Sequence, residues 1–214
     1  MARLAAMKVL ITGGAGYIGS TVATACIEAG IDVVILDDLS KGLRAFCEGR
    51  DLYEGDIADP DVLTHLLADH PDIDAVVHCA ARIVVPESVA DPLGYYDANV
   101  GKTIVLLQHL RDAGIARIVF SSSAAVYAGD SGEGADEGSP LGPSSPYATT
   151  KAMVEQILKD AASNGDFRAI ALRYFNPIGA DPKMRTGLQN PVPSHALGKI
   201  MQARAAGEPF AITG

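Results

Sequence analysis

The chain has 214 residues, of which 48% are hydrophobic and 20% are charged, and its formal net charge is −9. Nucleic acids are bound by clustered Lys and Arg side chains, so the acidic balance argues against a nucleic-acid partner. No apolar run approaches the roughly 18 residues that a membrane helix needs, and no signal-peptide pattern is present. Cys26, Cys47 and Cys79 lack metal-binding or CxxC spacing, so we expect a soluble, cytoplasmic protein with free thiols and no metal site.

A glycine-rich turn follows the first predicted strand. Apolar residues predict that strand over 8–12, and Gly13, Gly16 and Gly19 then open a helical stretch that ends at Gly30. Glycines at this spacing allow a tight turn, and they let backbone N–H groups approach a pyrophosphate at the N-terminus of the helix. Because a strand precedes the turn and a helix follows it, the pattern predicts a dinucleotide-binding loop.

The second predicted strand, 32–36, ends in Asp37 and Asp38. An acidic side chain at this point can accept hydrogen bonds from the ribose hydroxyls of adenosine, and its charge would repel a 2′-phosphate. Asp37 therefore favours NAD over NADP. The alternative is an ordinary solvated turn residue.

The rest of the chain alternates strands and helices. Strands are predicted at 52–54, 75–79, 117–120 and 168–174, and helices at 59–70, 91–113, 146–164 and 194–206. Residues 177–193 are predicted as a loop, and a last apolar run covers 210–212. Continuously apolar strands that alternate with helices indicate a doubly wound α/β fold, in which a parallel sheet is covered on both faces.

Small and polar residues follow three of these strands. Ligands of open α/β sheets bind at the carboxyl ends of the strands, so these residues could contact a dinucleotide, although each alone could equally be a simple turn former. They are Asp56 and Ile57, then Cys79, Ala80 and Ala81, and then Ser121, Ser122 and Ser123.

Tyr147 and Lys151 share one face of a predicted helix that begins at Pro146. A nearby ammonium favours the phenolate and lowers the tyrosine pKa from about 10, which would make Tyr147 a general base for an alcohol. A solvated surface pair is the alternative reading. A serine such as Ser123 could stabilise the charge that develops on a substrate oxygen.

Together these residues resemble the UDP-glucose 4-epimerases among the extended short-chain dehydrogenase/reductases. The resemblance runs in family order from Val9 to Gly179. Its matching stretches are 12–19 (TGGAGYIG), 55–57 (GDI), 87–89 (ESV), 95–100 (YYDANV), 121–127 (SSSAAVY), 145–147 (SPY) and 172–180 (LRYFNPIGA).

The resemblance implies an NAD-dependent inversion at C4 of a UDP-hexose. Tyr147 would take the proton of the sugar 4-OH, Lys151 would lower the pKa of Tyr147, and Ser123 would hold the reacting oxygen. The implied cofactor-binding residues are Gly13, Gly16, Tyr17, Ile18, Gly19, Asp37, Asp38, Leu39, Asp56, Ile57, Cys79, Ala80, Ala81, Asn99, Ser121, Tyr147, Lys151, Tyr174 and Phe175. The implied substrate-binding residues are Ser123, Tyr147, Asn176, Asn190 and Ala211.

Ala124 and Ala125 occupy positions where dehydratase and decarboxylating relatives carry acidic residues, which favours simple epimerisation. Another reductase acting on a nucleotide sugar, and a non-catalytic NAD-binding module, stay open as alternatives. The resemblance further implies a Rossmann-like domain over 1–180, the beginning of a smaller substrate-binding domain over 181–214, and a homodimer formed through helices 91–113 and 147–164. We expect most of the substrate domain to lie beyond residue 214.

Overall fold

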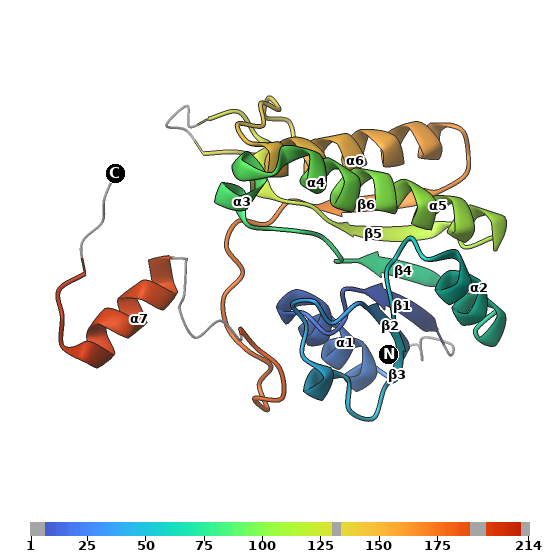
Figure 1. The fold of residues 1–214 in the computed structure, drawn as a ribbon, viewed down its shortest axis with the longest axis horizontal. Helices are drawn as coiled ribbons and strands as arrows, with labels where there is room; N and C mark the ends of the chain where they lie inside the picture. Colours follow the sequence, from blue (N-terminus) through green and yellow to red (C-terminus); the bar gives the residue numbers. More distant parts are fainter. Residues whose placement is uncertain (1–6, 130–133, 189–195, 211–214) are drawn as a thin grey trace.

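The computed structural model describes residues 7–129, 134–188 and 196–210. Within these residues, parallel strands form one sheet in the order β3-β2-β1-β4-β5-β6 (Figure 1). The chain reverses its direction of winding between β1 and β4, so the doubly wound α/β fold is confirmed. The strands are β1 (Lys8–Thr12), β2 (Asp32–Asp37), β3 (Asp51–Glu54), β4 (Ala75–His78), β5 (Arg117–Ser121) and β6 (Arg168–Leu172).

Two helices, α2 (Pro60–Asp69) and α6 (Pro146–Ser163), begin at the residues that the sequence marks as starts. Asp59 caps α2 and Ser145 caps α6, and each cap is followed by a proline. The predicted helix over 91–113 is interrupted by a π-helical segment, η2 (Asp97–Gly101). The principal helices are α1 (Tyr17–Glu28), α2 (Pro60–Asp69), α4 (Pro92–Tyr96), α5 (Lys102–Asp112), α6 (Pro146–Ser163) and α7 (Ala196–Ala206).

Three short elements lie where no helix was predicted. They are the 3₁₀ turns η1 (Arg44–Cys47) and η3 (Ala124–Val126) and the helix α3 (Val85–Ala90). The predicted strand over 168–174 ends two residues early, because the backbone after Leu172 leaves the sheet.

The core lies on both faces of the sheet. Leu10 packs with α2, α5 and α6 on one face, through residues such as Leu66, Leu106 and Val154. Its neighbour Ile11 packs on the opposite face with residues of α1 and β2. Alternate side chains of one strand thus bury into two separate clusters, as expected for a parallel sheet with helices on both faces.

The β6 edge of the sheet is less covered. Ile170 and Leu172 point away from α6 and are 62% and 45% exposed. In Figure 1, α7 is set apart from the sheet. Across the described residues, no helix is both long and apolar enough to span a membrane.

Candidate functional site

The glycine turn between β1 and α1 is packed too tightly for side chains. Gly13 has φ +69°, and a Cβ there would lie 2.6 Å from the backbone nitrogen of Ala80. A Cβ on Gly19 would lie 2.2 Å from the carbonyl oxygen of Gly13. The N-cap residue Gly16 offers no capping side chain, and the first turn of α1 has no acidic residue. This helix N-terminus is therefore suited to bind a phosphate anion, which fits the predicted dinucleotide.

Asp37 lies at the end of β2, where the sequence predicted it, and its carboxylate already has backbone partners. It accepts hydrogen bonds from the N–H groups of Ala15 and Leu39, both at 2.9 Å. Burial raises the pKa of this carboxyl despite these two bonds. Asp37 therefore shapes the glycine turn, and a ribose could use only the remaining lone pairs of its oxygens. Leu39 itself adopts a left-handed conformation, with φ +55°.

The predicted residues at the ends of β3 and β4 differ in whether their side chains are still available to a ligand. The carboxylate of Asp56 forms an ion pair with Lys102 and accepts the N–H of Ala58, and Ile57 is buried. Burial raises the pKa of the Cys79 thiol to about 11, although the nearby Ser121 side chain and Lys151 act in the opposite direction. Cys79 is therefore a protonated, structural thiol in this setting.

Tyr147, Ser123 and Lys151 converge at the carboxyl end of β5. The hydroxyl of Ser123 lies close enough to that of Tyr147 to lower the pKa of the phenol. Lys151 is 3% exposed, and its Nζ donates to the carbonyl oxygen of Ser121 at 2.8 Å. The same Nζ lies 6.0 Å from the centroid of the Tyr147 ring. The structure thus brings the three predicted catalytic side chains into one group.

The expected direction of the Tyr147 pKa is wrong for the unliganded chain. Burial raises the pKa of Tyr147, and the opposing effect comes from the Ser123 hydrogen bond rather than from Lys151. Lys151 is itself desolvated, and burial lowers the pKa of its amine to about 8. The amine is directed at a carbonyl oxygen and contributes none of the effects that shift the pKa of Tyr147, so it does not favour the phenolate here.

Asn99, which the resemblance placed at the cofactor, is engaged by the protein. Its Oδ1 accepts the N–H of Arg82 at 2.8 Å, and its Nδ2 donates to the Arg82 carbonyl at 2.9 Å and to Thr150 at 3.0 Å. Thr150 in turn donates to the carbonyl oxygen of Tyr147 at 2.7 Å. Asn99 therefore fixes the start of α6 relative to the loop after β4.

A buried histidine that sequence reasoning missed joins β1 to the same π-helical segment. The hydroxyl of Thr103 donates to the Asn99 carbonyl, so it accepts from His78 Nε2 at 3.0 Å. His78 Nδ1 then accepts from the hydroxyl of Thr12 at 2.6 Å. Burial lowers the pKa of His78 to about 3, which keeps the imidazole neutral.

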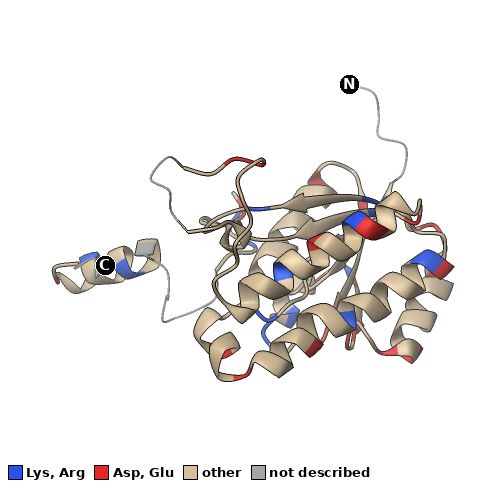
Figure 2. Cartoon of the chain, turned by 90° about the horizontal axis from the view of Figure 1, so that it is seen from above, with Lys and Arg blue, Asp and Glu red and all other residues tan. Residues whose placement is uncertain are grey.

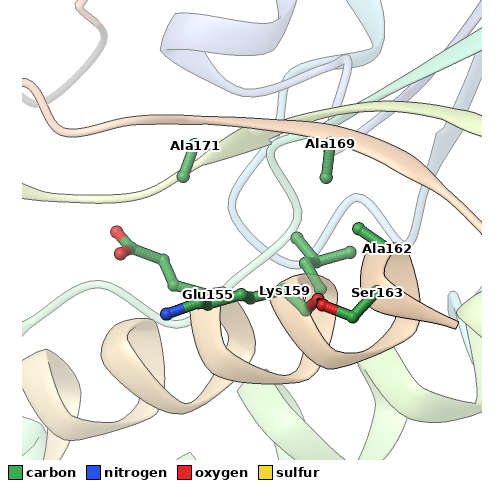
Figure 3. A pocket seen from close by; sticks show the side chains of 7 residues that line it. Glu155, Lys159, Ala162, Ser163, Ala169 and Ala171 are labelled. Carbon is green, nitrogen blue, oxygen red and sulfur yellow. Dashed lines mark hydrogen bonds between the residues drawn. The ribbon is translucent and has the colours of Figure 1, made fainter.

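A second missed feature is the carboxylate of Glu155, one helical turn beyond Lys151. Arg173 approaches it through Nη2 at 2.6 Å and Nε at 3.0 Å, and Ser122 donates to it as well. Glu155 therefore ties α6 to the ends of both β5 and β6. Figure 3 shows it at one end of a groove between α6 and β6, into which Ala169 and Ala171 point.

Of the predicted site residues that follow β6, one lies at the site, two are exposed, and two fall outside the described residues. Tyr174 reaches the site, where its hydroxyl is hydrogen-bonded to Ser121. Phe175 is 71% exposed and Asn176 is exposed as well. Asn190 and Ala211 lie outside the described residues. Figure 2 shows Lys and Arg scattered over several elements rather than gathered into one stripe.

A family model agrees with this geometry. Residues 9–214 match the NAD dependent epimerase/dehydratase family. The chain belongs to this family. Members of the NAD dependent epimerase/dehydratase family bind the cofactor that the glycine turn and Asp37 predict, so the NAD prediction is confirmed at the level of the family.

Individual relatives are UDP-glucose 4-epimerases. The chain is 46% identical over 200 residues to the enzyme of Azospirillum brasilense, covering 93% of this chain and 57% of that protein. It superposes with a TM-score of 0.88 and 38% identity on the UDP-glucose 4-epimerase of Stenotrophomonas maltophila with bound NAD and formylated UDP-arabinopyranose, covering 94% and 62% of the two chains. The enzyme of Brucella ovis in complex with NAD gives the same values. The chain thus spans about 60% of the length of these relatives, and the resemblance seen in the sequence is confirmed.

Proposed function

We propose that this chain is the cofactor-binding and catalytic part of an enzyme that interconverts UDP-glucose and UDP-galactose by inversion at C4. The observation that carries the proposal is the convergence of Tyr147, Ser123 and the buried amine of Lys151 at the carboxyl end of β5. This group lies on the same sheet edge as the glycine turn, and the relatives with that arrangement are UDP-glucose 4-epimerases.

The residues have separable roles in such a reaction. Tyr147 takes the proton of the 4-OH and returns it after the 4-keto sugar has turned over in the site. Ser123 donates a hydrogen bond to the reacting oxygen as its charge changes. NAD, when bound, supplies the acceptor and later the donor of the C4 hydride. Since proton and hydride are both returned, substrate and product have the same composition and no external reductant is consumed.

Competing functions are less well supported. Ala124 and Ala125 follow Ser123 and carry no acid or base, so a dehydratase would lack the group that expels water. Another reductase of nucleotide sugars needs the same Tyr147 and Lys151 but releases an oxidised or reduced product. A non-catalytic NAD-binding module needs neither side chain, and the convergence of both on Ser121–Ser123 argues against that function.

The same proposal includes the partner and the location. Exposed apolar side chains on α4, α5 and α6 support a homodimer formed through these helices, because Leu93, Ile104 and Met153 are 80%, 38% and 41% exposed. Sedimentation equilibrium measures the oligomeric state directly.

The three free cysteines support a reducing compartment, namely the cytoplasm. The proposed substrate pair would assign the enzyme to galactose metabolism.

The deciding experiment incubates the purified protein with UDP-galactose, without added nucleotide cofactor. We expect UDP-glucose to form until the two sugars equilibrate. Tyr147→Phe should lose nearly all turnover and keep bound NAD, whereas Tyr53→Phe, a change to a tyrosine on β3 with its hydroxyl on Asp69, should be as active as the wild type. A product that has lost water, or a fully active Tyr147→Phe protein, would contradict the proposal.

A further inference from the structure

One segment of the chain runs along the carboxyl ends of the strands, from the end of β6 to α1. Residues 174–187, which we call the strap, leave the end of β6 and pass the carboxyl ends of the strands to reach α1 (Figure 1). At the first end, the carbonyl oxygen of Tyr174 accepts the N–H of Ala124 at 3.0 Å. At the other, the hydroxyl of Tyr17 donates to the carbonyl oxygen of Gly179 at 3.0 Å. The five intervening steps can span at most about 17 Å of extended chain, so the two fastened ends cannot lie farther apart than that.

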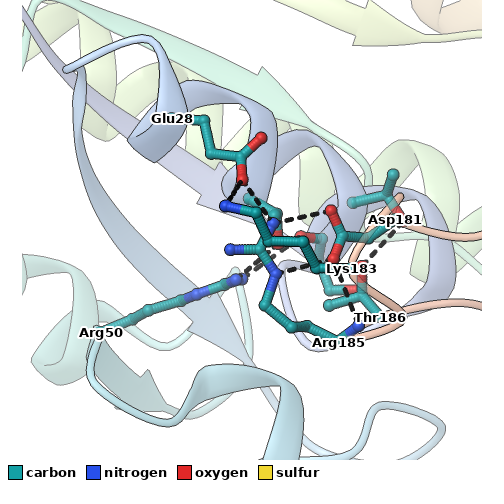
Figure 4. A network of polar contacts seen from close by, with 9 residues as sticks. Glu28, Arg50, Asp181, Lys183, Arg185 and Thr186 are labelled. Atoms are coloured by element: carbon teal, nitrogen blue, oxygen red, sulfur yellow. Dashed lines mark hydrogen bonds and ion pairs between the residues drawn. The ribbon is translucent and has the colours of Figure 1, made fainter.

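Beyond Gly179 the strap is fastened to α1 by charged side chains (Figure 4). Asp181 is 2% exposed, and Arg185 donates to its two oxygens through Nε and Nη2, both at 2.7 Å. The same Nη2 reaches Glu28 on α1 at 2.7 Å, and Lys183 reaches Glu28 at 2.8 Å. We call Glu28, Asp181, Lys183 and Arg185 the α1 clamp.

Between its two fastened ends the strap makes little contact with the protein. Phe175 and Ile178 are 71% and 62% exposed, and residues 176 and 177 are exposed as well. These four residues form no helix or strand. Their position is therefore set by the contacts at the two ends of the strap and not by their own packing.

The two ends of the strap coincide with the two ends of the predicted cofactor site. Tyr17 begins α1, whose N-terminus is suited to the pyrophosphate, and Tyr174 is bonded to Ser121 beside Tyr147 and Lys151. A dinucleotide that reaches from the glycine turn to Tyr147 must run along the strap. We propose that the α1 clamp is a retention device that slows NAD release by holding the strap beside the cofactor.

This inference rests on the NAD binding of the proposed function, and it assigns the greatest weight to Asp181 and Arg185. Glu28 and Lys183 are 41% and 68% exposed at the side chain, and ion pairs in that position contribute little to stability. Asp181 is buried, so removing Arg185, the cation in ion-pair contact with it in the described structure, would leave a carboxylate held only by backbone N–H groups and the more distant charge of Arg50. Loss of Arg185 therefore loosens the strap more than loss of Lys183.

The test compares Arg185→Gln with Lys183→Gln and with Asp72→Asn, which removes an exposed ion pair of the same length at the opposite end of β1. Each protein is loaded with labelled NAD and then mixed with an excess of unlabelled NAD. The rate at which the labelled NAD is released is measured. We expect Arg185→Gln to release NAD about tenfold faster, which corresponds to about 1.4 kcal/mol. Lys183→Gln and Asp72→Asn should stay within about twofold of the wild type.

A second measurement uses the unliganded protein. Hydrogen exchange followed by mass spectrometry should be faster in peptides of the strap in Arg185→Gln, and unchanged in peptides of β4 and β5. Unaltered strap exchange would overturn the clamp, and faster exchange with an unaltered NAD release rate would overturn its retention role. A wild-type protein that does not bind NAD would refute both this inference and the proposed function, whereas a variant effect missing from an NAD-binding protein would refute the inference alone.

Discussion

Lys151 donates a hydrogen bond from Nζ to the carbonyl oxygen of Ser121 at 2.8 Å, which joins the middle of α6 to the end of β5. The amine is 3% exposed and also lies 4.8 Å from the centroid of the Phe120 ring. Among the described residues it forms no ion pair with a carboxylate. A cation held in this way costs the unliganded fold stability, because its burial is offset only by a neutral carbonyl and an aromatic face.

Replacement of this lysine should therefore stabilise the unliganded protein. Its pKa falls from 10.5 to about 8 on folding, a net penalty of about 3 kcal/mol at pH 7, and the variant would lose about 1 kcal/mol because the Ser121 carbonyl is left without its donor. We expect Lys151→Met to raise the free energy of unfolding at pH 7 by about 2 kcal/mol while abolishing turnover. Urea titration measures the first effect.

The increase in the free energy of unfolding caused by Lys151→Met should depend on pH, because the pKa of Lys151 is lower in the folded than in the unfolded protein. A lysine whose pKa is lower in the folded protein contributes stability above pH 10.5, and that stability is lost as the pH falls through 8. The advantage of Lys151→Met should therefore shrink between pH 8 and 10.5. Lys159→Met, an exposed change on the same helix, is the matched control and should show no such trend. A Lys151→Met protein that is less stable at pH 7 would contradict this account.

Removal of the Ser123 hydroxyl should change the titration of Tyr147. The hydrogen bond from Ser123 lowers the pKa of Tyr147, so its loss raises that pKa further. In Ser123→Ala, the rising limb of the turnover rate against pH should move to higher pH. The rate at neutral pH should fall, because a smaller fraction of Tyr147 is present as phenolate and the reacting oxygen loses a hydrogen-bond donor. Pre-steady-state assays with UDP-galactose from pH 6 to 10 measure this. A limb that moves to lower pH would refute the assigned direction.

His78 should make the fold sensitive to acid. Because burial lowers its pKa from 6.5 to about 3, the unfolded chain binds the proton more readily across that window. Stability present above pH 6.5 is therefore lost as the pH falls towards 3. His78→Asn should be less stable at pH 7 and show a flatter decline, as measured by chemical denaturation at pH 7, 6, 5 and 4. His65→Asn, at a side chain that is 73% exposed, should decline as the wild type does.

The ion pair of Glu155 and Arg173 should support turnover as well as stability. Glu155 is 9% exposed at the side chain and Arg173 is 21% exposed, so Glu155→Ala leaves a largely buried guanidinium and should cost about 3 kcal/mol. It also frees Ser122, which lies between Ser121 and Ser123, so the turnover rate should fall more than substrate affinity. Denaturant titration and steady-state kinetics test the two effects. Glu155→Gln retains an acceptor for Ser122 and should be milder, and equal losses in the two variants would contradict the positioning role.

The strands and the main helices could be predicted because their signals are local. Buried parallel strands have apolar runs, and Asp59-Pro60 and Ser145-Pro146 mark two helix starts directly. The helix α3 was missed because its N-cap, Val84, and its first residue, Val85, are β-branched and suggest extended chain. It is ordered by Tyr95, whose hydroxyl lies 2.8 Å from the Val84 carbonyl, and that contact is not visible in sequence.

The candidate site likewise contains residues that could be predicted from the sequence and contacts that could not. Gly13, Asp37, Tyr147 and Lys151 could be predicted because each belongs to a short motif with a physical meaning. The partners of these groups could not. The Lys151–Ser121 bond links residues 30 positions apart, and the Arg185–Glu28 pair links residues 157 positions apart. Only the folded sheet brings such residues together, so the pKa values of Tyr147 and Lys151 were beyond prediction from local pattern.

The π-helical segment Asp97–Gly101 fixes the register of the long helix around it. A π turn holds one residue more than an α turn, so a one-residue deletion inside it can be absorbed by its conversion to an α turn, whereas a deletion at the start of α5 would rotate the rest of that helix by about 100°. After a deletion in α5 the helix could keep Tyr95 beneath Val84 or keep Leu106 and Leu110 in the core, but not both. A one-residue deletion should therefore be tolerated better within 97–101 than at the start of α5.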